Sequence, residues 1–201
     1  RTPQPAVPRR ASPACWPQAH RFMLDRTGRD PVDVGISVSD CFFYQGEPKR
    51  DDVVAFMPRR GAPIAANCQR RTADLAYLAI DGQIEPDCAQ SMKRAGWYLA
   101  TSVGEWFGLP SLEAMAAGCL VASVPVVGGM DFLVPDGNCL LCEPDDLPEQ
   151  LERLSRPDFR DERTRLRQRG LETAQAYRRS VHRRKLARSL RGRLGELVSW
   201  A

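Results

Sequence analysis

The stretch Gly104-Glu-Trp-Phe-Gly-Leu-Pro-Ser-Leu-Glu-Ala-Met-Ala-Ala-Gly118 decides the fold of the chain. It follows an apolar run, Trp97-Tyr-Leu-Ala-Thr-Ser-Val103, which predicts a buried strand. Pro110 suits the first position of a helix, and Gly118 is placed to end that helix. The stretch therefore predicts a strand, a loop and a short helix in succession.

Two carboxylates flank the N-terminus of this helix: Glu105 in the loop and Glu113 in the first helical turn. Free backbone N–H groups around Gly108, Leu109 and Ser111, with the helix dipole behind them, favour a phosphate-like anion. The carboxylates would repel that anion unless each accepts hydrogen bonds from neutral hydroxyl groups. A ligand with phosphate in the middle and a diol at each end satisfies every group, and a nucleotide diphosphate sugar has this layout.

Outward from this stretch, strands and helices alternate. Three further apolar runs predict strands, at 52–57, 77–80 and 119–124, and helices are predicted over 64–76, 85–95, 147–154, 160–177 and 181–198, with a short one after Met130. This order predicts an α/β fold with a Rossmann-like, doubly wound parallel sheet, in which ligands bind beyond the carboxyl ends of the strands. The residues expected to converge there are Arg59, Arg60, Asp81, Gly82, Glu105, Gly108, Gly128 and Gly129.

The central stretch resembles the signature of the retaining glycosyltransferases of the GT-B type, family four-like (glycosyl transferases group 1). The resemblance rests on Glu105-x7-Glu113 with Phe107-Gly108-Leu109-Pro110 inside it, and it extends from about Asp52 to about Asp145. It implies that the chain is the C-terminal, donor-binding domain of an enzyme with two Rossmann domains. The implied reaction transfers a sugar from a nucleotide-activated donor to a hydroxyl acceptor, in surface polysaccharide or glycan synthesis.

The resemblance also implies roles for single residues. Glu105 would contact the transferred sugar and Glu113 the ribose of the nucleotide. The backbone amides of Phe107, Gly108 and Leu109 would hold the diphosphate or the sugar. Partners implied in the same way are a nucleotide sugar donor, a glycan or lipid-linked acceptor and, in the full-length protein, an N-terminal Rossmann domain.

Arg59 and Arg60 directly follow the predicted strand at 52–57, where forked guanidinium donors suit phosphate oxygens. The family has an Arg and a Lys in this region, and here no matching Lys is present. A solvated pair of arginines is the alternative. The resemblance places Gly82 near the nucleotide base, although an acid and a glycine occur in many turns between a strand and a helix.

The Gly128–Gly129 turn follows the strand at 119–124, and the resemblance implies that it contacts the donor. The family usually carries a Glu three residues beyond the second Gly. This chain has Phe132 there, with Asp131 just before it. We therefore expect donor contacts from the two glycines and no acid function at this turn.

Several motifs are absent. No G-x-G-x-x-G follows a strand, which argues against a conventional dinucleotide-binding dehydrogenase. The P-loop motif G-x-x-x-x-G-K-[ST] is also absent, so a P-loop NTPase is not supported. Asp-x-Asp, the metal-diphosphate motif of the other major glycosyltransferase architecture, is missing too. We expect no metal and no cofactor, because arginine side chains and a helix N-terminus can neutralise a leaving diphosphate.

Composition points to a globular protein, with 201 residues, 43% of them hydrophobic, and no apolar run long enough to span a membrane. An odd number of cysteines suits reduced thiols and a cytoplasmic location better than a disulfide framework. Cys139-Leu-Leu-Cys142 lies in a probable strand without a second Cys pair or a nearby His, so a zinc site is not favoured. The seven cysteines are Cys15, Cys41, Cys68, Cys88, Cys119, Cys139 and Cys142.

Residues 1–50 are expected to be an irregular lead-in and the remnant of an inter-domain linker, and residues 51–201 the nucleotide-sugar-binding domain with its C-terminal helices. The length leaves room for one ordinary domain. An N-terminal acceptor domain would therefore be missing. The alternative to an active glycosyltransferase is a catalytically incomplete module that binds a nucleotide sugar.

The last predicted helix carries leucines on one face and many basic residues around it. Its leucines favour docking on the domain, and its charge is also typical of peripheral contact with an anionic membrane surface. Nucleic acid is not expected as a partner, because the net charge is only +4 and no recognition motif is present. The leucines are Leu186, Leu190, Leu194 and Leu197; the basic residues are Arg183, Arg184, Lys185, Arg188, Arg191 and Arg193.

Overall fold

The computed structural model describes residues 13–14, 17–28, 31–33, 35–105 and 107–198. The chain forms two compact units. The larger unit is Val38–Arg179, and the smaller one takes in the described residues up to Ser37 and from Ser180 onward. All the residues that the sequence singled out for ligand binding belong to the larger unit.

The larger unit is built on a five-stranded sheet with the order β4-β3-β5-β6-β7, in which every neighbouring pair is parallel. The chain leaves β3 toward one side to form β4 and then crosses back to form β5. The direction of winding therefore reverses between β3 and β5. The strands are β3 (Arg50–Phe56), β4 (Ala76–Ala79), β5 (Ala95–Ala100), β6 (Leu120–Ser123) and β7 (Leu140–Leu141).

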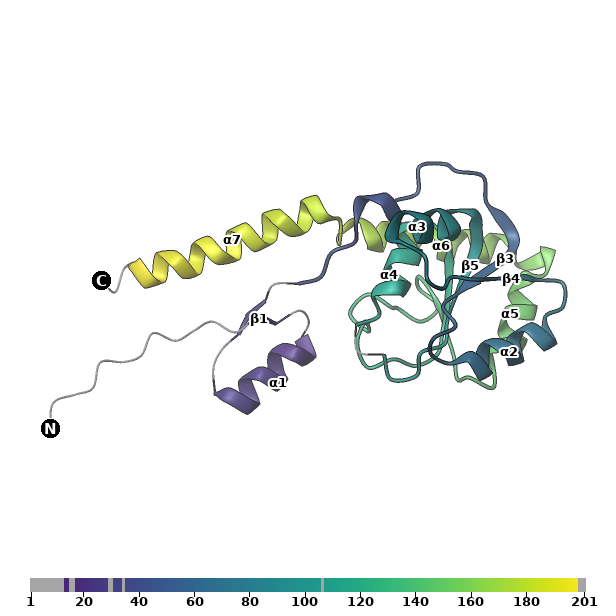
Figure 1. Cartoon of the computed structure of the whole chain (residues 1–201), viewed down its shortest axis with the longest axis horizontal. Helices are drawn as coiled ribbons and strands as arrows, with labels where there is room; N and C mark the ends of the chain where they lie inside the picture. The colour runs from purple at the N-terminus through teal and green to yellow at the C-terminus, as the bar shows by residue number, and fades with distance from the viewer. Residues whose placement is uncertain (1–12, 15–16, 29–30, 34, 106, 199–201) are drawn as a thin grey trace, which may run out of the picture. The chain divides into compact units, whose positions relative to one another are not determined.

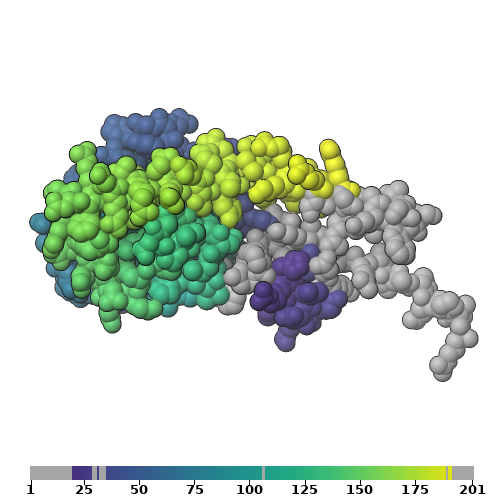
Figure 2. Space-filling model, turned by 180° about the vertical axis from the view of Figure 1, so that it is seen from behind, coloured from purple at the N-terminus to yellow at the C-terminus, as the bar shows by residue number. Residues whose placement is uncertain are grey.

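Helices cover both faces of the sheet, as Figure 1 shows: α2 and α5 lie on one side, and α3 and α4 lie on the other. The long α6 packs against α4 and β6, and it lies on the near face in the view from behind (Figure 2). The predicted α/β fold with a doubly wound parallel sheet is confirmed. The helices are α2 (Ala62–Arg71), α3 (Glu85–Arg94), α4 (Leu109–Ala116), α5 (Leu147–Ser155) and α6 (Arg160–Gln175), with short 3₁₀ helices η1 (Asp40–Phe42) and η2 (Pro157–Phe159).

The core follows from the alternation of side chains along strands that are buried on both faces. In β5, Trp97 and Leu99 join the cluster under α2 and α5, whereas Tyr98, between them, does not belong to that cluster. From α5, Leu147, Leu151 and Leu154 enter the same cluster at spacings of four and three. Because both faces are covered, the ligand-binding surface is left to the ends of the strands.

Two predicted helices differ from the structure. The helix expected over 64–76 ends at Arg71, because Thr72 donates its Oγ1 hydrogen to the Cys68 carbonyl at 2.8 Å and closes the last turn. The short helix expected after Met130 is a turn. There Asn138 accepts from the Val134 amide and donates to the Phe132 carbonyl, and these bonds replace helical ones.

The smaller unit contains β1 (Pro13–Ala14), α1 (Pro17–Thr27), β2 (Val32–Asp33) and nearly all of α7 (Arg179–Val198). The two short strands pair in parallel. The helix α1 lies in a stretch that the sequence analysis expected to be irregular, and Pro17 at its first position is typical of a helix start. Among the described helices, none is both long and apolar enough to cross a membrane.

Candidate functional site

The site is built where the winding of the sheet reverses, beyond the carboxyl ends of β3 and β5. The loops that follow these two strands are pressed together. Thr101 donates its Oγ1 hydrogen to the carbonyl oxygen of Arg60 at 2.8 Å. A Cβ on Gly61 would lie 2.0 Å from the carbonyl oxygen of Thr101, and Gly61 has a φ of 71°. Only glycine fits at this contact, which brings Arg60 to the crevice.

Arg60 faces Glu105 across the crevice, with 3.7 Å between Nη1 and Oε2. The Arg60 side chain is 71% exposed, whereas that of Glu105 is only 21% exposed. The other carboxylate oxygen of Glu105 accepts a hydrogen bond from the Phe107 amide at 3.2 Å. The carboxylate is thus held over its own loop, with an exposed cation beside it.

Arg59 is directed elsewhere. Its Nε donates to Oδ1 of Asp81 at 2.8 Å, and both side chains are mostly exposed. This surface ion pair joins the end of β3 to the end of β4. Gly82, the next residue, is exposed, has a φ of 65°, and has open space where a Cβ would stand. The two arginines predicted as one phosphate-binding pair therefore have different partners.

The glycines of the loop after β5 and of the loop after β6 lie against each other, at the sheet edge where they were predicted to converge. The amides of Val127 and Gly128 both donate to the Glu105 carbonyl, at 3.0 and 2.8 Å. A Cβ on Gly108 would lie 3.3 Å from the Gly128 carbonyl oxygen and 3.5 Å from Cα of Gly129. The Gly128–Gly129 turn therefore lies directly against the loop that carries Glu105.

Phe132, which stands where the resembled family has a Glu, is buried under these glycines. Its Cζ atom would lie 3.1 Å from a Cβ on Gly108 and 3.0 Å from one on Gly129, and its ring meets Tyr177 edge to face. Asp131 is turned to Tyr177, whose hydroxyl donates to Oδ2 at 3.5 Å. Phe132 thus supports the floor of the two loops.

The N-terminus of α4 offers fewer free amides than the sequence suggested. The helix begins at Leu109, and the Ser111 amide donates to the Gly108 carbonyl at 3.0 Å, so the expectation that it is free was wrong. The Phe107 amide is bound to Glu105. The amides of Gly108 and Leu109 donate to no other residue that the structure describes, so they remain for an anion.

Glu113 is the fifth residue of α4 and not part of its first turn, a correction that follows from the helix starting at Leu109. Burial, and then the charge of Glu85, raise the pKa of Glu113 to about 7. Its carboxyl makes no hydrogen bond within the described part of the chain. Hydrogen bonds from neutral hydroxyl groups would lower the pKa of such a buried carboxyl, because they stabilise its ionised form.

Glu85, which the sequence analysis did not single out, lies at the start of α3 and affects Glu113 through its charge. Hydrogen bonds from Ser39 and Cys41 lower the pKa of Glu85, and the Cys41 Sγ–Glu85 Oε1 distance is 3.4 Å. In the sequence, Glu85 looks like any acidic residue that the helix dipole favours at the start of a helix. The one sign of a role near the site was its position shortly after the Asp81-Gly82 turn.

A recess of about 50 Å³ opens between the two loops, and its lining includes Thr101, Glu105, Gly108 and Ser111. Ligand pockets usually measure about 300–1,000 Å³, so the recess can hold only part of a ligand. No group of three or more His, Cys, Asp or Glu side chains able to hold a metal occurs among the described residues. The described cysteines are free thiols.

Residues 59–156 match the family model described as glycosyl transferases group 1. This segment carries every residue predicted for the site. None of the curated proteins matches the chain in sequence.

Solved structures share the fold. The C-terminal domain of the glycosyl transferase group 1 family protein LpcC from Francisella tularensis is 18% identical, with a TM-score of 0.56, and the match covers 71% of this chain and 100% of that one. Sucrose-phosphate synthase from Thermosynechococcus elongatus is 18% identical, with a TM-score of 0.71 and coverage of 92% and 58%. HepE from Anabaena, in complex with UDP-glucose, is 14% identical, with a TM-score of 0.71 and coverage of 90% and 64%.

The fold is therefore that of the C-terminal domain of GT-B glycosyltransferases. The chain spans 58% of the sucrose-phosphate synthase chain and 64% of the HepE chain. These two proteins thus contain a large part that has no counterpart in this chain.

Proposed function

We propose that the chain is the donor-binding part of a family-four-like glycosyltransferase, which transfers a sugar from a nucleotide diphosphate to a hydroxyl acceptor with retention of configuration. One observation carries the proposal. Arg60, Glu105 and the Gly128–Gly129 turn meet at the point where the sheet reverses, at the N-terminus of the helix that also bears Glu113. These elements would supply the cation, the amides and the two carboxylates that a nucleotide sugar requires.

The diphosphate would lie against the Arg60 guanidinium and the free amides of Gly108 and Leu109. Hydrogen bonds from the guanidinium group and from the amides would become stronger as negative charge develops on the departing diphosphate. Arg60 is exposed and can reorient toward a ligand, because its contact with Glu105 is long, at 3.7 Å. In this arrangement no metal and no cofactor is needed, and Arg59 contributes at most from a distance.

Glu105 would orient the transferred sugar. The Phe107 amide and Arg60 each engage one of its oxygens, and an ionised carboxylate still has lone pairs for sugar hydroxyl groups. Because its backbone carbonyl also accepts hydrogen bonds from the amides of Val127 and Gly128, the two loops would present their sugar-binding groups together. Retention of configuration is proposed on the resemblance alone.

Glu113 would accept hydrogen bonds from the ribose. Its raised pKa, of about 7, makes the free carboxyl readily protonated at neutral pH. Two ribose hydroxyls would favour the ionised form, since they satisfy oxygens that have no hydrogen-bond partner among the residues that the structure describes. We therefore expect donor binding to release protons near neutral pH.

The nucleotide and the acceptor are proposed by comparison. HepE was solved with UDP-glucose, which makes a uridine diphosphate sugar the first donor to test. A glycan or lipid-linked acceptor would be bound by an N-terminal Rossmann domain of a longer protein, and surface polysaccharide synthesis is the proposed setting. The alternative is a nucleotide-sugar binding module without transfer activity.

Peripheral membrane contact through α7, at the cytoplasmic face, is part of the same proposal. Arg184, Arg188 and Arg191 lie along one side of this helix with Ala187. Leu190 is 45% exposed. The side chains of Leu194 and Leu197 lie outside the described residues. Basic side chains next to an exposed leucine suit an anionic lipid surface.

Calorimetric titration with UDP, GDP, dTDP and UDP-glucose tests the proposal. We expect one base to be preferred, and Glu113→Ala to weaken binding about tenfold or more, since a hydrogen bond to a charged group contributes roughly 1.5–3 kcal/mol. Glu149→Ala, at an exposed position in α5, is the matched control and should bind as the wild type does. Equal affinity of the Glu113→Ala variant, or no binding by the folded chain, would contradict the proposed site. Transfer to a supplied acceptor separates the enzyme from the inactive module.

A further inference from the structure

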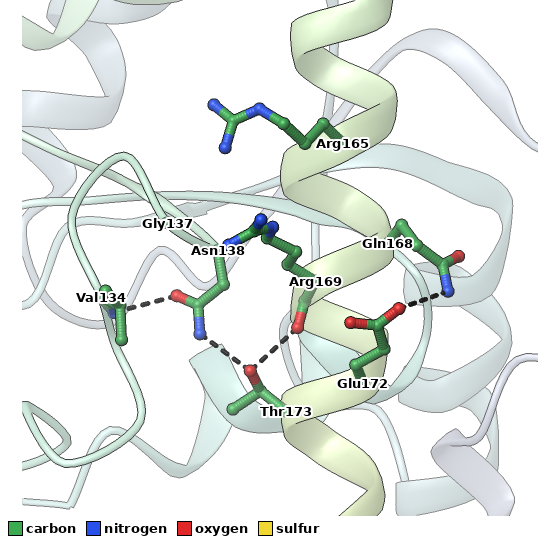
Figure 3. A pocket seen from close by; sticks show the side chains of 8 residues that line it. All are labelled: Val134, Gly137, Asn138, Arg165, Gln168, Arg169, Glu172 and Thr173. Carbon is green, nitrogen blue, oxygen red and sulfur yellow. Dashed lines mark hydrogen bonds between the residues drawn. The ribbon is translucent and has the colours of Figure 1, made fainter.

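A second hollow, of about 500 Å³, lies between the turn before β7 and α6. Figure 3 shows the residues that line it, which come from the turn at 134–138 and from two successive turns of α6. None of them belongs to the candidate site described above. Its volume is within the range of small-molecule sites, although it is open to solvent.

Two arginines extend from α6 into this hollow. Arg165 and Arg169 are one turn apart, and Figure 3 shows both guanidinium groups on the side of α6 that faces the turn. Arg165 donates to the carbonyl oxygen of Asp136 at 3.1 Å. Neither arginine forms an ion pair with any carboxylate that the structure describes. Like charges at this spacing repel each other, so an anion between them would be stabilising.

The rest of the wall is already satisfied. Asn138 accepts from the Val134 amide, and its Nδ2 donates to the Phe132 carbonyl and to Oγ1 of Thr173. Thr173 in turn donates to the Arg169 carbonyl at 2.8 Å. The donors that remain for a ligand are therefore the guanidinium groups, carried on a wall whose other polar groups hold one another in place.

One acid also lines the hollow. Glu172 accepts a hydrogen bond from Nε2 of Gln168 at 3.0 Å, as Figure 3 shows, and both side chains line the same hollow as the two arginines. The negative charge of Glu172 lowers the affinity of the hollow for an anion. A ligand that binds both guanidinium groups is therefore favoured over one that binds a single guanidinium group.

We propose that this hollow binds a small molecule that carries a phosphate monoester. A phosphate dianion balances two guanidinium charges, and its three terminal oxygens can accept from both forks at once, whereas a carboxylate fills only one. Val134, which is 51% exposed at the rim, offers apolar contact to the carbon skeleton of the ligand. The proposal does not depend on the proposed glycosyltransferase function.

Titration followed by amide NMR tests it, with inorganic phosphate, ribose 5-phosphate and, as an uncharged control, ribose. Binding in the hollow should shift the amides of Gly137, Asn138 and Thr173, with ribose 5-phosphate tighter than phosphate and ribose without effect. Shifts confined to Gly108 and Leu109 would place the phosphate at the other site and overturn the proposal. So would the absence of shifts with either phosphate.

Variants make the test specific. Arg165→Ala combined with Arg169→Ala should weaken ribose 5-phosphate at least tenfold, and the two Lys replacements should weaken it several-fold because they keep the charge but lose the fork. Arg71→Ala combined with Arg94→Ala removes the same charge from two exposed positions on other helices. This control should bind as the wild type does, and an equal loss in the control would reduce the effect to net charge and refute a site.

Discussion

Nη1 of Arg60 lies 3.7 Å from Oε2 of Glu105, across the crevice where the winding of the sheet reverses. The contact joins the loop after β3 to the loop after β5. Arg59, which directly precedes Arg60 in the chain, forms an ion pair with Asp81 instead. The two positions therefore offer a matched pair for testing which guanidinium serves the ligand.

Arg60→Ala should weaken binding of a nucleoside diphosphate about tenfold or more, because a charge-assisted hydrogen bond to phosphate is lost. Arg59→Ala removes the same charge but only an exposed ion pair, and should change the affinity little. Calorimetry with UDP and with uridine measures both. Equal losses of affinity in the two variants would mean that the arginines act only through their long-range positive charge and that neither contacts the phosphate directly.

Gly61→Ala should destabilise the larger unit by about 2–4 kcal/mol, since left-handed backbone and a clash with buried groups each contribute roughly 1–3 kcal/mol. Its Cβ would stand 2.0 Å from the Thr101 carbonyl oxygen. Gly82→Ala is the control: its φ is also positive, at 65°, but the Cβ would enter open space. Urea unfolding compares them, and similar losses would show that the contact with Thr101 is easily relaxed.

Glu113 should make stability depend on pH. Its pKa is raised to about 7 in the folded chain, from a model-peptide value of 4.5, because burial and Glu85 disfavour the charge. The unfolded chain then loses its proton first, so the contribution of Glu113 to stability is full below about pH 4.5 and is lost as the pH rises to about 7, on the order of 3 kcal/mol in total.

Glu113→Gln removes that dependence, because the amide does not ionise. Urea unfolding at pH 5 and pH 8 should therefore show a smaller difference for Glu113→Gln than for the wild type. Glu149→Gln, on an exposed turn of α5, should behave as the wild type does. An unchanged difference in Glu113→Gln would mean that other groups cause the pH dependence.

Lys93 and Glu47 form an ion pair of 2.7 Å in which only 6% of the Lys93 side chain is exposed. Burial raises the pKa of Glu47, but hydrogen bonds from Lys93 and the Gln45 amide outweigh it and lower the pKa to about 2. The stabilisation is therefore present above about pH 4.5 and is lost as the pH falls toward 2.

Removing one partner of this pair should have unequal effects. Glu47→Gln leaves a buried ammonium without its counter-charge, and we expect a loss of about 3–5 kcal/mol. Lys93→Met leaves Glu47, which is more exposed and can be hydrated, so the loss should be smaller. Chemical denaturation at pH 7 measures both, and a larger loss for Lys93→Met would contradict this ranking.

Local patterns were sufficient for the elements around the site. Gly118, with a φ of 74°, ends α4 as predicted, and the amides of Gly118 and Cys119 close it onto Met115 and Ala114. The start of the helix was predicted one residue late, which moved Glu113 into the first turn. Periodicity determines that a helix exists more firmly than where it begins.

The sequence by itself determined the alternation of strands and helices, and with it the parallel sheet and the edge at which Glu105, Gly108 and the Gly128–Gly129 turn converge. These features depend on the spacing of apolar residues, glycines and prolines along the chain. Only the tertiary structure decided that Arg60 and not Arg59 faces the crevice, and that Glu113 is buried near Glu85. Such contacts join residues far apart in the sequence, and their energies depend on distance and burial, which no local pattern contains.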